Sequence, residues 1–119
     1  MKKTRLAANE LAKFFGVLAH PLRIQILEEL QNSELTVSEL KNRLDTPQAS
    51  LSQHLGILRT NKMLIERRVG KHVFYHLRYP KIATIILECI SFILPDLEES
   101  GDIISAMQSA KDAWRLESD

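Results

Sequence analysis

The sequence predicts a mainly α-helical fold with one β-hairpin, and three observations support this prediction. Apolar residues recur at helical spacing along most of the 119 residues. The segment 63–77 instead alternates apolar and polar residues, as strands do. Short turn-forming segments such as Asp45-Thr46-Pro47 separate the elements, and we find no repeat or linker. We therefore expect residues 1–119 to form a single domain.

Two helices are predicted before residue 31. The first spans about residues 6–18, and its apolar residues at helical spacing are Leu11, Phe14, Phe15 and Leu18. The second begins after His20 with Pro21 in its first turn, where proline is favoured. Its inward residues are expected to be Leu22, Ile26, Leu27 and Leu30. We interpret both stripes as core.

Residues 36–60 are predicted to form two helices joined by a tight turn. Thr36 and Glu39 have the spacing of a capping box, in which each side chain bonds the other residue's backbone N–H. Pro47 ends this first helix because the residue before a proline leaves helical geometry. The second helix, 48–60, places Leu51, Leu55 and Leu58 on one narrow stripe, which must be buried.

The opposite face of helix 48–60 is polar but not strongly charged. It carries Ala49, Ser50, Gln53, Gly56 and Thr60, with Gln48 and Ser52 beside them. Such side chains can enter the major groove and hydrogen-bond base edges. The DNA contacts that we assign to this helix are Gln48, Ala49, Ser50, Ser52, Gln53 and His54. The alternative is an ordinary helical hairpin with a polar outer face.

Residues 63–77 predict a two-stranded hairpin with a turn at Val69-Gly70-Lys71. The basic residues near its tip are Arg67, Arg68, Lys71 and His72. A basic hairpin directly after a recognition-type helix is well placed to contact the phosphate backbone. Helix-turn-helix followed by such a hairpin is a winged helix. A winged helix used only for protein interaction or dimerisation would instead expose apolar or acidic residues on these surfaces.

Four ordered segments resemble the ArsR family of bacterial winged-helix repressors. They are His20-Pro21-Leu22-Arg23-Ile24-Gln25-Ile26-Leu27, residues 34–40, residues 48–59 and residues 67–77. The resemblance covers roughly residues 8–94 and implies a homodimer on a pseudo-palindromic operator of double-stranded DNA. It also implies that the protein blocks transcription until a signal releases it. The family usually has glycine where Lys62 stands, so we expect Asn61 to adopt the left-handed backbone instead.

The formal net charge of +1 conceals an asymmetry. From Arg59 to Lys81, Glu66 is the only acidic residue among several lysines and arginines, whereas acidic residues predominate from Glu88 onward. Clustered positive charge on the wing favours a phosphate contact, and an acidic end should point away from DNA.

The segment 80–116 is predicted to supply further helices, rich in isoleucine. A small chain cannot bury so much apolar surface alone, so we expect helices 6–18 and 80–116 to form a homodimer interface. The alternative is an extended monomer core. No apolar stretch is long enough to span a membrane and no secretory signal is recognised, which predicts a cytoplasmic protein.

The signal is the least constrained part of the prediction. Soft-metal sensors of this family often carry two cysteines in the segment corresponding to Thr36-Val37-Ser38, which has no cysteine here. The second metal site of the family needs histidine ligands, and no histidine follows His76. His72 and His76 could share an ion, but a phosphate contact and a packed or exposed wing side chain are favoured. We therefore predict no metal site and no cofactor, which leaves a small-molecule effector, a redox effector or no effector.

Cys89, the single cysteine, lies in an apolar helix and is expected to be a small core residue. A redox-responsive repressor acting through Cys89 is the alternative. Ser52 and His54 do not form a nucleophile and base with an orienting acid, and no phosphate-binding loop is present. We therefore expect no enzymatic activity.

Overall fold

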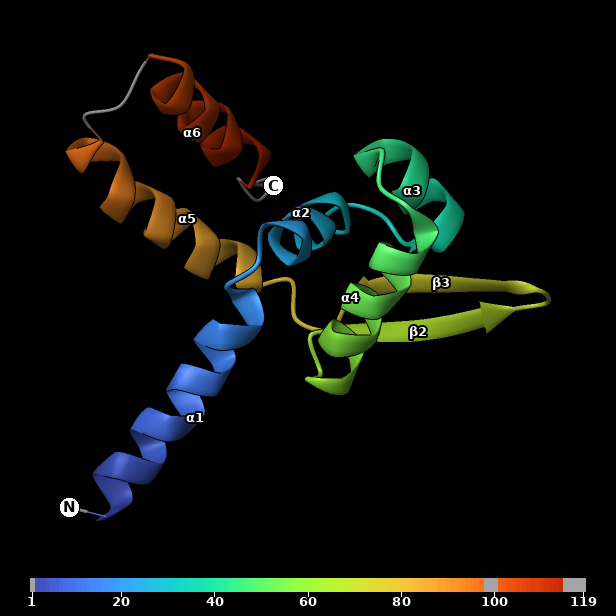
Figure 1. The fold of residues 1–119 in the computed structure, drawn as a ribbon, viewed down its shortest axis with the longest axis horizontal. Coiled ribbons are helices and arrows are strands. Elements are labelled where there is room, and N and C mark those ends of the chain that lie inside the picture. The colour runs from blue at the N-terminus through green and yellow to red at the C-terminus, as the bar shows by residue number, and fades with distance from the viewer. Residues whose placement is uncertain (1, 98–100, 115–119) are drawn as a thin grey trace. The chain divides into compact units, whose positions relative to one another are not determined.

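The computed structural model describes residues 2–97 and 101–114 and divides the chain into two compact units, Met1–Arg78 and Tyr79–Asp119. The assignment of residues 1–119 to a single domain stays a prediction. The elements of the first unit are α1 (Lys2–Leu18), α2 (Pro21–Glu29), β1 (Leu35–Thr36), α3 (Val37–Leu44), α4 (Gln48–Thr60), β2 (Leu64–Val69) and β3 (His72–Leu77). The fold class, a mainly helical winged helix-turn-helix, is confirmed (Figure 1).

The predicted helix-turn-helix is confirmed in detail. Thr36 caps α3 through a full capping box: its hydroxyl accepts from the Glu39 backbone N–H at 3.2 Å, while a Glu39 carboxylate oxygen accepts from the Thr36 N–H at 3.0 Å. Asp45 ends the helix in the left-handed conformation, φ 48°. Pro47 then precedes α4, whose bounds are those predicted. The turn thus combines a left-handed end of α3 at Asp45 with a proline at the start of α4, where no side chain caps the helix.

The core of the first unit lies among α2, α3, α4 and the sheet. The leucine stripe of α4 is fully buried, with Leu51 and Leu58 at 0% exposure and Leu55 at 1%. Its neighbours in this core are Ile26, Leu27, Leu30, Leu35, Leu40, Leu64 and Leu77. Each such side chain contributes about 1.5–3 kcal/mol when it leaves water. These contacts determine which face of α4 points outward.

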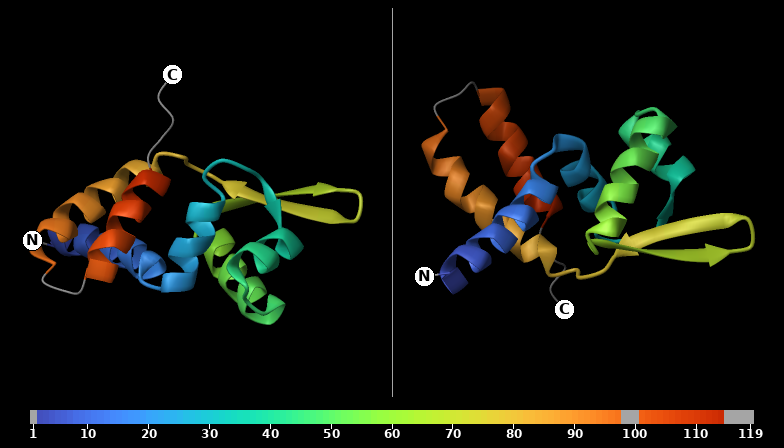
Figure 2. Two further views of the ribbon diagram at one scale, coloured as in Figure 1. Left: turned by 90° about the horizontal axis from the view of Figure 1, so that it is seen from above. Right: turned by 60° about the horizontal axis from the view of Figure 1, so that its bottom comes forward.

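The wing contains one strand more than the sequence predicted. β1 pairs with β3, and β3 pairs with β2, so the sheet is three-stranded with the order β1-β3-β2. The prediction of a two-stranded wing was incomplete because β1 has only two residues, too few to show an alternating pattern. Gly70 and Lys71 connect β2 to β3, and Gly70 has φ 61°, as the first position of a type II′ turn requires. β2 and β3 extend as a hairpin beyond α4 (Figure 2).

The expectation that Asn61 adopts the left-handed backbone is wrong. Lys62 itself does so, with φ 62°, while Asn61 has φ −89°. The Met63 N–H donates to the Leu58 carbonyl at 2.9 Å, and the Lys62 N–H donates to the Arg59 carbonyl at 3.0 Å. This is a Schellman motif, which requires the left-handed residue one position later than expected. Asn61 stabilises the same C-terminal end of α4 by donating its side-chain N–H to the Ile57 carbonyl.

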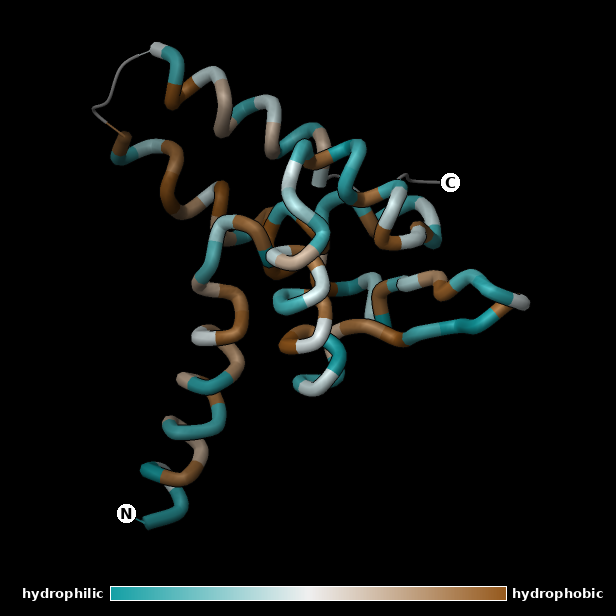
Figure 3. Tube along the Cα trace, turned by 45° about the vertical axis from the view of Figure 1, so that its right-hand side comes forward, coloured by the Kyte–Doolittle hydropathy of each residue, from teal (hydrophilic) through white to brown (hydrophobic). Residues whose placement is uncertain are grey.

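α1 differs from the prediction of a buried apolar stripe. Leu18 is buried, but Leu11 and Phe15 are 58% and 54% exposed, because α1 extends away from the rest of its unit (Figures 1 and 3). These residues are core only if something outside this unit covers them.

The second unit contains α5 (Ile82–Ile93), a 3-10 turn (Leu94–Asp96) and α6 (Gly101–Ala113). Residues 98–100 and 115–116 of the predicted segment 80–116 lie outside the described residues. Side chains on one face of α5, such as Ile86 and Ile90, are buried, whereas Ile85 and Phe92 are exposed. Among the described helices, none is long and apolar enough to cross a membrane.

The expectation that Cys89 is a core residue is wrong, because its side chain is exposed. Cys89 lies four residues after Ile85 and three before Phe92, so it shares their exposed stripe. The apolar sequence of α5 thus covers two faces, and the described residues bury only one of them.

The Schellman exit leads to a stability prediction. Replacing Lys62 with glycine should raise the free energy of unfolding by about 0.5–1 kcal/mol. The strain energy of a lysine in the left-handed conformation is larger than the extra conformational entropy that a glycine loses on folding. Asn61→Gly is the matched control and should lower stability, because it removes the bond to the Ile57 carbonyl at a residue without positive φ. Urea unfolding of the two variants checks this. Equal effects would contradict the assigned backbone geometry.

Candidate nucleic-acid interface

The outward face of α4 carries the polar residues that the sequence singled out. Gln48, Ala49, Ser52 and Gln53 are exposed, and Ser50 is half-buried. The buried leucine stripe fixes this orientation, so the amide and hydroxyl groups point to solvent. The face bears hydrogen-bond donors and acceptors of neutral charge, which suit base edges.

His54 does not share this orientation. Its side chain is half-buried, and its Nδ1 accepts a hydrogen bond from Arg23 Nε at 3.2 Å. Its ring centroid lies 4.2 Å from that of His20. The contact with α2 occupies the imidazole, and we therefore leave His54 out of the set of base contacts. Spacing along one helix could not show this, because the partners lie some 30 residues earlier in the chain.

The register of the wing places Arg67 and Arg68 on opposite faces of the hairpin. Arg68 is opposite Val73, and Glu66 is opposite Tyr75, so these four side chains lie on one face of the hairpin. Arg59 Nε of α4 lies 3.0 Å from Glu66 Oε1, which identifies this face as the one toward α4. Burial raises the pKa of Tyr75, as does the charge of Glu66, while Arg59 and Arg68 act in the opposite direction. Arg68 therefore lies on the side of the wing that faces the candidate recognition helix.

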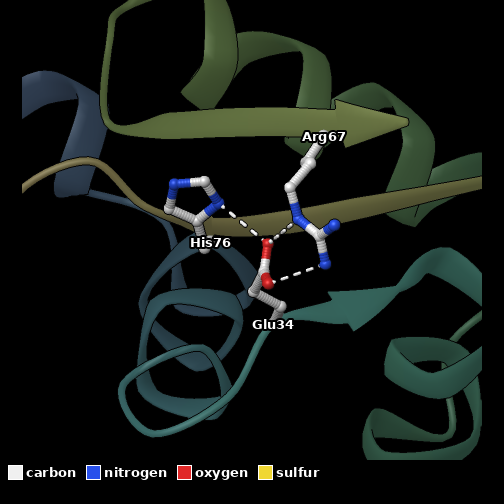
Figure 4. A network of polar contacts seen from close by, with 3 residues as sticks. All are labelled: Glu34, Arg67 and His76. Carbon is white, nitrogen blue, oxygen red and sulfur yellow. Dashed lines mark hydrogen bonds and ion pairs between the residues drawn. The ribbon is translucent and has the colours of Figure 1, made fainter. Parts of the chain in front are cut away.

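Arg67 points to the other face, where Glu34 holds it. Its Nε and Nη2 each donate to a carboxylate oxygen of Glu34 at 2.9 Å, a two-point contact (Figure 4). The guanidinium also lies 5.3 Å from the Phe74 ring centroid. Hydrogen bonding from Arg67 is the main reason that the pKa of Glu34 is lowered, and the same bonds raise the pKa of Arg67.

His76 approaches the same carboxylate from β3. Its Nδ1 lies 3.2 Å from Glu34 Oε2, and the two form an ion pair when the imidazole is protonated. We name Glu34, Arg67 and His76 the wing-base cluster. It ties the segment before β1 to both long strands of the wing. Sequence reasoning missed Glu34, because its partners lie far along the chain and no local pattern joins them.

Pairing therefore reduces the set of basic side chains available on the wing. Arg67 is bound to Glu34 and Arg59 to Glu66, whereas Arg68, Lys71 and His72 are exposed. Lys71 and His72 stand at the tip, in and beside the turn. The tip half of the hairpin is mainly hydrophilic (Figure 3).

A cleft of about 550 Å³ separates the start of α3 from the wing tip. Its lining comprises Thr36, Val37, Ser38, Glu39, Lys71, His72, Val73 and Phe74. The two hydroxyl residues at the positions of the family's thiolates lie in this lining, and the Thr36 hydroxyl is engaged in the capping box. Bonding from the Thr36 backbone is the main cause of the lowered pKa of Glu39. Within residues 2–97 and 101–114, no group of three or more His, Cys, Asp or Glu side chains is arranged to hold a metal ion.

Comparison with known proteins agrees with this geometry. A helix-turn-helix domain family matches residues 18–67. The biofilm growth-associated repressor of Agrobacterium fabrum is 40% identical over 79 residues, which are 66% of this chain and 68% of that protein. The HTH-type transcriptional repressor SmtB of Mycobacterium tuberculosis is 38% identical over 85 residues, 71% of this chain and 61% of that protein.

A similar fold occurs among solved structures. The transcriptional repressor BigR from Xylella fastidiosa matches with a TM-score of 0.64 and 29% identity, over 83% of this chain and 98% of that one. The shared fold, the helix-turn-helix match and the identity to these repressors lead to one conclusion. The chain belongs to the ArsR family of winged helix-turn-helix transcriptional repressors.

Proposed function

We propose that this repressor binds its operator as a homodimer, reading bases with the exposed face of α4 and holding the phosphate backbone with Arg68 and Lys71. The observation that carries the proposal is the orientation of α4. Its leucines are buried, so Gln48, Ser52 and Gln53 are turned outward. Arg68 lies on the side of the wing toward that helix.

The chemistry of the side chains explains why α4 would contact bases and the wing would contact phosphates. A glutamine amide can bond both N6 and N7 of adenine, a two-point contact that only the right base offers. Arginine and lysine on the wing neutralise phosphates and release counterions whatever the sequence. Arg67 is a weaker candidate for this task than the sequence suggested, since Glu34 already neutralises it.

The exposed apolar faces support the homodimer. In the first unit, α1 exposes Leu6, Leu11 and Phe15, and in the second unit α5 exposes Ile85, Phe92 and Ile93, with Phe92 at 81%. Large apolar side chains gathered on a helix face are typical of association surfaces. A two-fold axis would also present two copies of α4 to successive turns of the DNA major groove.

The wing cleft favours a signal other than a thiolate-bound metal. Hydroxyl oxygens of Thr36 and Ser38 are poor ligands for soft ions, and the capping box already uses the Thr36 hydroxyl. We propose that regulation, where it occurs, uses a small organic ligand or a redox change. Cys89 is exposed on the apolar stripe of α5, so a thiol reaction there would act on the proposed dimer surface.

Separate effects on specificity and affinity test the interface. Gln53→Ala should weaken operator binding by roughly 1–3 kcal/mol and leave binding to random DNA almost unchanged, because only the correct base hydrogen-bonds the amide. Arg68→Ala should weaken both and reduce the salt slope by about one counterion. Fluorescence anisotropy across a salt series measures both quantities.

Arg67→Ala is the matched control for Arg68→Ala, because the two residues are adjacent on β2 and point to opposite faces of the hairpin. It should change the salt slope less, because Glu34 already compensates its charge. An equal loss on operator and random DNA for Gln53→Ala would remove α4 from base reading. A larger slope change for Arg67→Ala than for Arg68→Ala would reverse the assignment of the wing faces.

The homodimer is tested by placing a charge on its proposed surface. Phe92→Glu should weaken dimerisation by about 2 kcal/mol or more, as loss of a central aromatic contact does. Asn32→Glu adds the same charge in an exposed loop of the other unit and should leave the oligomeric state unchanged. Sedimentation equilibrium distinguishes these outcomes. A Phe92→Glu protein that remains as dimeric as the control would move the interface away from α5.

Metal titration tests the proposed kind of signal. Zinc and arsenite added to the purified protein should show no stoichiometric site by calorimetry and no change in operator affinity, because the hydroxyls of Thr36 and Ser38 stand where thiolates would be needed. A site tighter than about 1 μM that also weakens operator binding roughly tenfold would refute this assignment.

A further inference from the structure

Two histidines and an arginine meet where α2 packs against α4. His20 is the N-cap residue of α2, and its Nδ1 accepts the Leu22 N–H at 3.2 Å. His54 on α4 accepts from Arg23 Nε through its own Nδ1, also at 3.2 Å. The two imidazole rings are tilted against each other with centroids 4.2 Å apart. We name His20, Arg23 and His54 the helix-junction cluster.

Both hydrogen bonds require an unprotonated nitrogen. An imidazole nitrogen that accepts an N–H cannot carry a proton, so each of these bonds exists only while that Nδ1 is unprotonated. Protonation of Nδ1 would convert each acceptor into a donor that faces another donor. It would also place two imidazolium ions side by side, next to the permanent charge of Arg23.

The cluster connects three helices. Besides its bond to His54, Arg23 donates from Nη1 to the Val17 carbonyl near the end of α1 at 3.0 Å. One guanidinium therefore links the C-terminal turn of α1, the first turn of α2 and the middle of α4. Loss of the bond to His54 would remove this polar link between α2 and α4 and leave apolar packing as the contact between them.

We propose that the helix-junction cluster makes sequence-specific operator binding sensitive to acid, with Arg23 and His54 acting as positioning residues for α4. This inference rests on the proposed DNA-binding function of α4. Protonation of the cluster breaks its two acceptor bonds and weakens the packing of α4 on α2. Base reading is lost first because it depends on the orientation of the helix, whereas contacts with phosphate tolerate displacement.

The surroundings of the cluster favour the neutral form. Burial is the main cause that lowers the pKa of His54, followed by His20 and Arg23, and no carboxylate of the described chain adds to these causes. Two ion pairs lie on the other elements around α4: Arg59 with Glu66 on β2, and Arg43 of α3 with Glu29 of α2. Nothing in these pairs stabilises an imidazolium at His54.

The sign of the stability effect follows. Because the pKa of His54 is lowered in the folded protein, the unfolded chain binds more protons below about pH 6.5. The free energy of unfolding should therefore fall as the pH drops below that value. This loss is independent of DNA and gives a second readout.

The experiment compares operator and random DNA across pH. The probe is a duplex selected from a random pool by the wild-type protein at pH 7.5, with a scrambled duplex of equal length beside it. The ratio of the two affinities should fall roughly 5-fold or more between pH 7.5 and 5.5, the range of a typical coupling between sites. Taking the ratio cancels any change in phosphate binding that is independent of sequence.

Matched variants assign the effect to the cluster. His54→Asn keeps an acceptor near the position of Nδ1 but cannot be protonated, and His20→Asn keeps a good N-cap. Each should reduce the pH dependence of the affinity ratio and of urea unfolding, and the double variant should remove most of both. His76→Asn removes a histidine of the wing-base cluster and should keep the wild-type fall.

Each outcome has a definite meaning. A wild-type ratio that stays constant to pH 5.5, or a double variant that falls in parallel with wild type, overturns the acid-sensitive link. If either single variant does not fold, the other still tests the proposal. Failure to select any preferred duplex at pH 7.5 contradicts the proposed DNA-reading function instead, so the two failures are distinguishable.

Discussion

The burial of one leucine stripe on α4 is the constraint on which the rest of this structure depends. Leu51, Leu55 and Leu58 leave water almost completely, in a core built by α2, α3 and the wing. Since a helix this short is stabilised mainly by the face it buries, the same contacts hold α4 and choose its outward side. The rotation of the helix, and with it the group of side chains available to a ligand, is therefore set by apolar packing.

Local chemistry explains why much of this fold could be predicted from the sequence. The capping box at Thr36 and Glu39, the break before Pro47 and the period of the α4 leucines act within a few residues of one another. The polar face of α4 followed directly, because it is opposite the buried stripe. A two-residue strand such as β1 carries no such pattern, and it exists only because β3 offers an edge with which to pair.

The parts that escaped prediction depend on contacts distant in sequence. Glu34 neutralises Arg67 from a loop that the strand pattern does not reach, and His54 is turned to α2 by Arg23 and His20. The burial of Cys89 was misjudged because an all-apolar helix does not reveal how many of its faces the chain can cover. In each case the chemistry of the side chain is evident from the sequence. Tertiary structure decides which partner the side chain contacts and whether it is buried.

The separation between the buried and outward faces of α4 also has an evolutionary consequence. Gln48, Ala49, Ser52 and Gln53 are exposed and contribute little to the core, so they can be exchanged at small thermodynamic cost. Surface substitutions of this kind leave folding intact while they alter what the helix displays. A duplicated copy of the gene could acquire a new target by changing these positions alone, and a designer could vary them as a library on an unchanged scaffold.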